Sequence, residues 1–162
     1  MSYTVRSSER TRSSGAEYET KALLYLMNFR SDSNEIHYFV VDFFNDLTGM
    51  DRFAENLWDV QSKGAKNNFP AAIGKELVTL FKNYLSDIDF KEYILFLGGV
   101  SSTVRVDDTL DIFDWSNVNI SALSKLKEGL KKEAKEKTYI NDYDITDSNI
   151  DDFLKKVTFV ID

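Results

Sequence analysis

Cysteine is absent from the 162-residue sequence, and histidine and proline occur once each. The lack of cysteine excludes disulfide bonds, thiolate metal sites and cysteine nucleophiles, and the single His37 confines histidine chemistry to one position. No run of about 18 apolar residues is present, and the N-terminus lacks the apolar segment of a signal peptide. These absences predict a cytoplasmic protein that has no membrane partner.

Positive charge is scarce relative to negative charge, with 20 Lys and Arg residues against 27 Asp and Glu residues and a formal net charge of −7. Such a chain repels nucleic acid at long range, which argues against a protein that coats DNA without specificity. A nuclease stays possible in principle, because a local basic surface is enough for phosphate contact when acidic residues lie elsewhere or hold a cation.

The length and composition predict one folded domain. Hydrophobic residues make up 43% of the chain and aromatic residues 14%, which is ordinary for a globular protein. Residues 1–13 are polar and rich in serine and arginine, and they lack apolar periodicity, so we interpret them as a flexible polar arm. The arm serves either solubility or phosphate contact. Residues 14–162 form the predicted domain.

The first half of the domain shows a helix followed by two strands. Residues 14–17 have the form of a capping box, and the apolar spacing that follows predicts a helix with Glu19 on its inner face. Residues 36–44 and 57–63 are rich in branched and aromatic side chains, which is typical of strands. We expect these two strands to be neighbours in a hairpin.

The second half continues with helices and strands in alternation. Pro70 opens a predicted helix, and residues 93–97 form a compact apolar strand. Residues 103–106 are a candidate short strand, and Asn119 caps a lysine-rich helix whose charge either grips DNA or forms a solvated face. A last short helix precedes a strand at residues 158–161. The predicted fold class is α/β, with a central mixed sheet of four or five strands flanked by helices.

Polar side chains are concentrated on one face of the strand at residues 57–63. Because side chains alternate along a strand, Asp59, Gln61 and Lys63 share this face. Asp46 ends the preceding strand, so a hairpin would return it close to Gln61 and Lys63, and Glu19 points inward from the first helix. Two interpretations stay open: a solvent-facing strand surface, or a site in which Glu19, Asp46, Gln61 and Lys63 converge where the first two strands diverge.

The second interpretation fits phosphodiester hydrolysis. This reaction needs charge neutralisation on the phosphoryl oxygens and an activated water, which a hard divalent cation and a lysine supply together. The Asp46 carboxylate and the Gln61 carbonyl oxygen suit Mg²⁺, and Glu19 would hold water on the metal. Lys63 would orient the attacking water, accept its proton or contact the scissile phosphate.

The same residues carry a resemblance to the PD-(D/E)XK nuclease superfamily, and within it to the Mrr-like branch, where glutamine replaces the acidic residue of the second motif. The matching segments are Gly15–Glu19, Asp42–Leu47 and Trp58–Lys63. The resemblance covers the chain from Gly15 to about Gly99. It implies a restriction-endonuclease-like fold and a nuclease-like domain over residues 14–162.

The resemblance also implies the site and the substrate. It makes Glu19, Asp46, Gln61 and Lys63 the active-site residues of an endonuclease that cleaves double-stranded DNA, with Mg²⁺ held by Asp46, Gln61 and Glu19 and Mn²⁺ able to substitute. The branch tends to have an acidic pair where this chain has asparagine followed by Asp46, so Asp42 and Asp51 stay open as alternatives to Asp46.

More narrowly, the arrangement is similar to the N-terminal nuclease domain of bacterial anti-phage effectors, such as the endonucleases associated with cyclic-nucleotide signalling. This implies a role in defence, a C-terminal sensor or ATPase region in a longer protein, and a homodimer that brings two sites together. Two other hypotheses stay open. One is a binding or oligomerisation module that kept the nuclease fold and lost activity, and the other is an unrelated α/β interaction protein.

Overall fold

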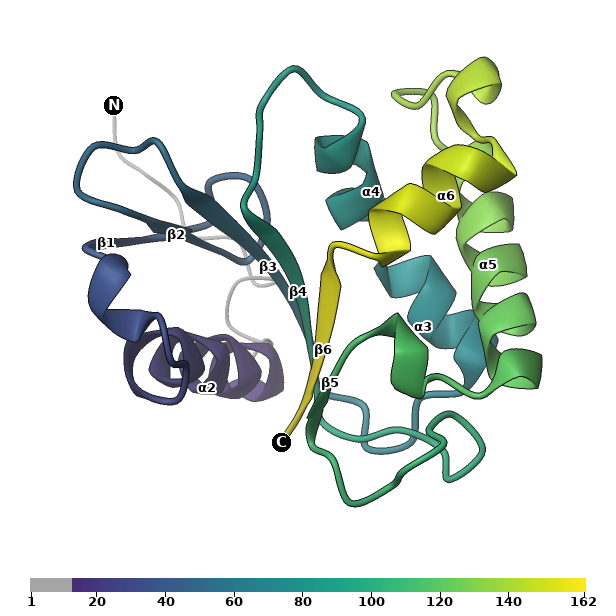
Figure 1. Cartoon of the computed structure of the whole chain (residues 1–162), viewed down its shortest axis with the longest axis horizontal. Coiled ribbons are helices and arrows are strands. Elements are labelled where there is room, and N and C mark those ends of the chain that lie inside the picture. Colours follow the sequence, from purple (N-terminus) through teal and green to yellow (C-terminus); the bar gives the residue numbers. More distant parts are fainter. Residues whose placement is uncertain (1–12) are drawn as a thin grey trace.

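The computed structural model of the protein describes residues 13–162, so the predicted polar arm lies outside the described residues except for its last position. Within this range the chain forms one six-stranded mixed sheet, five α-helices and three short 3-10 helices (Figure 1). The predicted α/β class is confirmed, and the sheet has six strands where the sequence predicted four or five.

The elements follow one another along the chain with a helix first and a strand last. In order they are α2 (Ser13–Asn28), η1 (Ser33–Glu35), β1 (Tyr38–Val41), β2 (Leu47–Met50), β3 (Leu57–Lys63), α3 (Pro70–Glu76), α4 (Val78–Tyr84), β4 (Glu92–Leu97), β5 (Ile112–Phe113), η2 (Trp115–Asn117), α5 (Ile120–Lys135), η3 (Asp142–Asp144), α6 (Asp147–Leu154) and β6 (Val157–Ile161).

The sheet joins an antiparallel half to a parallel half. Its strand order is β1-β2-β3-β4-β6-β5; β1, β2 and β3 form an antiparallel meander, whereas β3, β4 and β6 run parallel. The short β5 pairs antiparallel with β6 at the edge. Helix α2 packs on one face, and α3 to α6 cover the other (Figure 1). Among the described residues, no helix is both long and apolar enough to cross a membrane.

The predicted helix starts at Pro70 and after Asn119 are confirmed. Pro70 occupies the first turn of α3, where its missing N–H costs nothing. Asn119 caps α5 because its side chain accepts a hydrogen bond from the Ser121 amide at 3.1 Å. The first helix begins at Ser13, and the predicted capping box involves a side chain outside those described.

Two glycines bring α3 and α5 into direct backbone contact. A Cβ on Gly74 would lie 2.0 Å from the Leu126 carbonyl oxygen, and one on Gly129 would lie 2.2 Å from the Ala71 carbonyl oxygen. Neither position has room for a side chain, so the close approach requires glycine at both. This packing fixes the helical layer that covers β3 and β4.

The predicted hairpin between the first two strands is wrong. Residues 36–44 form only the four-residue β1, and an additional strand, β2, lies between β1 and β3. Thr48 and Gly49, residue types that favour turns, are part of β2, where a Cβ on Gly49 would lie 3.1 Å from Ile36 Cγ2. Glycine is therefore used here for close packing in a buried strand.

The weakly patterned middle of the chain also differs from the prediction. Residues 103–106 form no strand, and only an isolated bridge joins Arg105 to Val118. The two-residue β5 was not predicted, since a strand this short carries no periodicity. The edge of the sheet is thus set by tertiary packing.

Candidate functional site

Asp46 lies at the start of β2, whereas the sequence placed it at the end of the preceding strand. Because β2 is antiparallel to β3 and Leu47 pairs with Val60, the residue before Leu47 faces the carboxyl end of β3. Asp46 Oδ2 accepts hydrogen bonds from Gln61 Nε2, from the Ser62 amide and from Ser62 Oγ, each at 2.8 Å. The predicted proximity of Asp46 and Gln61 is therefore present, although a different strand produces it.

The polar row, defined as Asp59, Gln61 and Lys63, faces the helices: Asp59 is buried and Gln61 half-buried, whereas Lys63 is exposed at the end of the strand. Each of its members contacts one residue of α3 or α4. The contacts run from Asn83 Nδ2 to Asp59 Oδ2 at 2.7 Å, from Thr79 Oγ1 to Gln61 Oε1 at 3.0 Å, and from Lys63 Nζ to Glu76 Oε1 at 2.9 Å. Thr79 and Asn83 lie four residues apart on one face of α4, and Glu76 is the last residue of α3.

Asp59 is the most buried member of the polar row, with no solvent exposure. Its Oδ2 also accepts a hydrogen bond from Asn45 Nδ2 at 2.8 Å. Burial raises the pKa of Asp59 to about 6, although the hydrogen bonds from Asn83 and Asn45 act in the opposite direction. Within the described residues, Asp59 Oδ1 and the hydroxyl of its cross-strand neighbour Thr48 have no hydrogen-bond partner. The sequence interpretation gave Asp59 no role of its own, because its full burial depends on helices from elsewhere in the chain.

Glu19 and Asp46 line one cavity of about 160 Å³, together with apolar side chains of α2 and the first two strands. Gln61 reaches this group through its hydrogen bond to Asp46, and it does not line the cavity itself. Lys63 is also outside the lining, and its side chain is 45% exposed and paired with Glu76. Asp46 thus shares a cavity with Glu19 and a hydrogen bond with Gln61, whereas Lys63 ends β3 two residues after Gln61.

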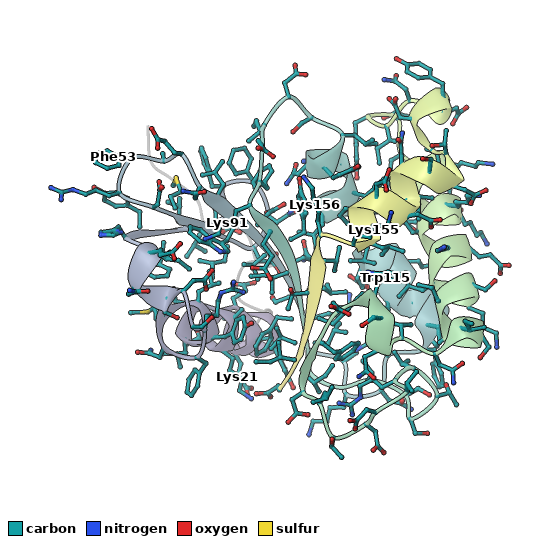
Figure 2. The ribbon with its side chains drawn as sticks, viewed as in Figure 1. Lys21, Phe53, Lys91, Trp115, Lys155 and Lys156 are labelled. Atoms are coloured by element: carbon teal, nitrogen blue, oxygen red, sulfur yellow. The ribbon has the colours of Figure 1, made fainter. Side chains whose placement is uncertain are left out.

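Tyr18, which precedes Glu19, holds α2 against the strand ends. A Cβ on Gly64 would lie 2.5 Å from Tyr18 Cδ2, and one on Gly98 would lie 2.8 Å from Tyr18 Cε1. The ring therefore fits over two glycines that directly follow β3 and β4. Lys21, one turn later, bonds to the carboxylate of Asp162 after β6 (Figure 2). The sequence offered a signal for this contact in the Gly-x-x-Tyr-Glu segment, but it did not show what the tyrosine packs against.

The two alternatives to Asp46 do not contact β3 in the described part of the chain. Asp51 accepts hydrogen bonds from the amides of Phe53 and Glu55 and from Asn56 Nδ2, which caps the β2–β3 turn; the bond from Asn56 is the main reason that its pKa is lowered. Figure 2 shows Phe53 at the tip of this turn. Asp51 thus lies at the far end of β2, roughly 17 Å from Asp46 at the usual rise of a strand.

Asp42 is close to Asp46 in the turn that joins β1 to β2, but it serves the backbone. Its amide donates to the Asp46 carbonyl oxygen at 3.2 Å, and its φ of 55° lies in the left-handed region that aspartate tolerates better than most residues. Its side chain is exposed. The carboxylate that meets Gln61 is therefore that of Asp46.

The side chains at this site include oxygen donors of the kinds that bind hard divalent cations. Across residues 13–162, no group of three or more His, Cys, Asp or Glu side chains is placed to hold a metal ion. Mg²⁺ in proteins is commonly held by one or two carboxylates together with neutral oxygens and water, and Asp46, Glu19 and the Gln61 amide oxygen match that composition. The Gln61 amide currently turns its nitrogen to Asp46 and its oxygen to Thr79, so it must rotate before its oxygen can reach a cation at Asp46.

Part of the positive charge of the lysine-rich helix α5 is neutralised by ion pairs within the molecule. Lys127 pairs with Asp151 and Lys131 pairs with Asp147, both on α6, and Lys137 pairs with Glu133. Two of these ion pairs join α5 to α6, and a contact of α5 with DNA stays a prediction. The sequence matches no protein-family model, and the chain matches no curated protein and no solved structure.

Proposed function

We propose that this chain is a Mg²⁺-dependent endonuclease domain with a restriction-endonuclease-like fold, acting on double-stranded DNA. The observation that carries the proposal is the contact of the Asp46 carboxylate with Gln61 and Ser62 at the carboxyl end of β3, two residues before Lys63. The carboxyl ends of parallel strands are where α/β proteins commonly place their ligands. The choice of DNA, and a role in anti-phage defence, rest on the resemblance alone.

In this proposal each residue has a separate task. Asp46 and Glu19 hold the cation at their shared cavity, and the rotated Gln61 amide adds a neutral oxygen. When bound, the cation neutralises charge on the phosphoryl oxygens and activates water. Lys63, which the ion pair with Glu76 keeps at the strand end, donates to the scissile phosphate or orients the attacking water.

The decisive test is Lys63→Ala assayed on supercoiled plasmid DNA with Mg²⁺. We expect cleavage to fall by roughly 100-fold or more, because the variant removes a cation from the developing charge of the transition state. The fold should survive, since an exposed ion pair contributes at most about 1 kcal/mol. Lys75→Ala is the matched control: it removes an exposed lysine of α3, next to the Glu76 that pairs with Lys63, and should leave cleavage within about twofold of wild type. Equal cleavage by the wild type and Lys63→Ala would contradict the proposal.

One observation favours a second candidate, a binding or oligomerisation module that kept this fold and lost activity. The Gln61 oxygen is bonded to Thr79 and Lys63 is paired with Glu76, so the protein already satisfies two of the four proposed active-site groups. Calorimetric titration of the well-folded protein with Mn²⁺ separates the two candidates. Binding with a stoichiometry of about one or two ions per chain supports the nuclease, and the absence of binding at millimolar Mn²⁺ supports the module.

A further inference from the structure

A buried carboxylate connects the turn that carries Asp46 to the helical layer. Asn45 immediately precedes Asp46, and its side-chain amide donates to Asp59 Oδ2 at 2.8 Å. The same oxygen accepts a hydrogen bond from Asn83 of α4 at 2.7 Å. Asp59 therefore bonds at once to the turn before β2 and to the helix over β3.

We propose that Asp59 is a positioning residue that fixes the Asp46 carboxylate through Asn45. An ionised carboxylate only accepts hydrogen bonds, so it receives two amide donors without competition from donors of its own. Asp59 is fully buried, which shields both bonds from water and makes their loss costly. The consequence for metal binding rests on the proposed function, whereas the consequence for the position of Asp46 does not.

On the β3 side, the Asp46 carboxylate itself is held by three hydrogen bonds from Gln61 and Ser62. The amide-to-carbonyl bond from Asp42 to Asp46 lies within the turn itself and does not tie it to the sheet. Phe44 provides an apolar anchor, because its ring packs edge-on against Phe90 with centroids 5.1 Å apart. The Asn45 amide adds a polar contact to the buried Asp59, on the side of the sheet that the helices cover. Removing it should leave the turn folded through Phe44 but free the neighbouring carboxylate to move.

The amide of Ser62 reports the position of Asp46 directly. It donates to Asp46 Oδ2 at 2.8 Å, at the position beyond the end of β2 where a backbone partner is lacking. Hydrogen exchange at this amide therefore slows only while the carboxylate stays in place. Measured by NMR on the full chain in the presence of a chelator, it tests positioning without any metal or substrate.

The experiment compares Asn45→Ala with Asn83→Ala. We expect Asn45→Ala to speed Ser62 amide exchange by about tenfold, as for the loss of one hydrogen bond, while Val60 in the middle of β3 exchanges as in wild type. Asn83→Ala breaks the other bond to Asp59 and keeps the link to the turn, so Ser62 should exchange within about twofold of wild type. Asp59→Asn should also resemble wild type, because its one oxygen can accept both amides.

Mn²⁺ titration of the same variants tests whether the position of Asp46 affects metal binding. Asn45→Ala should weaken Mn²⁺ binding by about 10-fold to 100-fold in calorimetry, the usual effect of losing a group that orients a ligand, and Asn83→Ala should weaken it less. Unchanged Ser62 exchange in Asn45→Ala overturns the positioning role, whatever the metal result. If the wild type binds no Mn²⁺, the proposed function fails, while Ser62 exchange still decides whether Asp59 positions Asp46.

Discussion

Strands β3 and β4 run parallel beneath the same helices, yet they present opposite chemistry to them. Leu95 of β4 pairs in register with Gln61, and Leu97 pairs with Lys63. The β4 side chains are fully buried in an apolar cluster, whereas the polar row of β3 is bonded side chain by side chain to the helices above it. A covered strand needs no polar groups for stability, and burying them carries a cost. β3 thus places a polar network under the helices, whereas β4 supplies apolar core.

Leu95→Ala tests the core side of this comparison and should have the largest effect. The side chain is fully buried, so its truncation leaves a cavity and should lower the free energy of unfolding by about 2–5 kcal/mol. Urea denaturation followed by circular dichroism measures the loss. The folded variant should bind Mn²⁺ as wild type does, and a loss below about 1 kcal/mol would show that β4 is not the structural strand we describe.

Asp59→Asn tests how far the buried carboxylate of Asp59 destabilises the folded protein. The measured quantity is the pH dependence of the free energy of unfolding. The pKa of Asp59 is raised to about 6 in the folded protein from an ordinary value of 3.8, so the folded state holds the proton more tightly than the unfolded state. Stability from this group is complete below about pH 4 and is lost as the pH rises through 6. Because 1 pKa unit corresponds to about 1.4 kcal/mol, the loss is roughly 3 kcal/mol near neutral pH.

Asparagine does not titrate, so the variant should escape that loss. We expect wild type and Asp59→Asn to have similar free energies of unfolding at pH 4, and the variant to gain by roughly 3 kcal/mol by pH 7.5. Urea denaturation at both pH values, with chelator present, gives the difference, and other titrating groups cancel between the two proteins. Parallel stability curves from pH 4 to 7.5 would contradict the raised pKa of Asp59.

Gln61→Leu replaces a member of the polar row with the residue type found at the paired position of β4. Of these variants it should change the free energy of unfolding least, so an effect on metal binding can be measured separately from an effect on stability. Asp46 keeps its two bonds to Ser62, so the free energy of unfolding should stay within about 1 kcal/mol of wild type. Mn²⁺ affinity should fall about tenfold, because the site loses a neutral oxygen donor. Leu95→Ala, at the paired position of β4, is the matched control, and unchanged Mn²⁺ affinity in Gln61→Leu would remove glutamine from the proposed ligand set.

Local sequence patterns predicted the helices and strands whose ends are set by neighbouring residues. The strand at Leu57–Lys63 was predicted with its observed bounds, because alternating side chains and polar flanking segments mark both ends. The helix starts at Pro70 and after Asn119 were predicted from capping chemistry that involves only neighbouring residues. β2 was missed because its four residues include a Thr-Gly pair that favours turns, and only pairing on both sides makes it a strand.

The sequence by itself determined which residues are candidates for the site, because the alternation of a strand places Gln61 and Lys63 on one face and composition leaves no cysteine and one histidine for other chemistry. Tertiary structure decided how they are used. The bond from Gln61 to Asp46 depends on a strand that was not predicted, and the burial of Asp59 depends on a helix 24 residues away in sequence. Such contacts join segments with no local pattern in common, so only the assembled sheet and helices determine them.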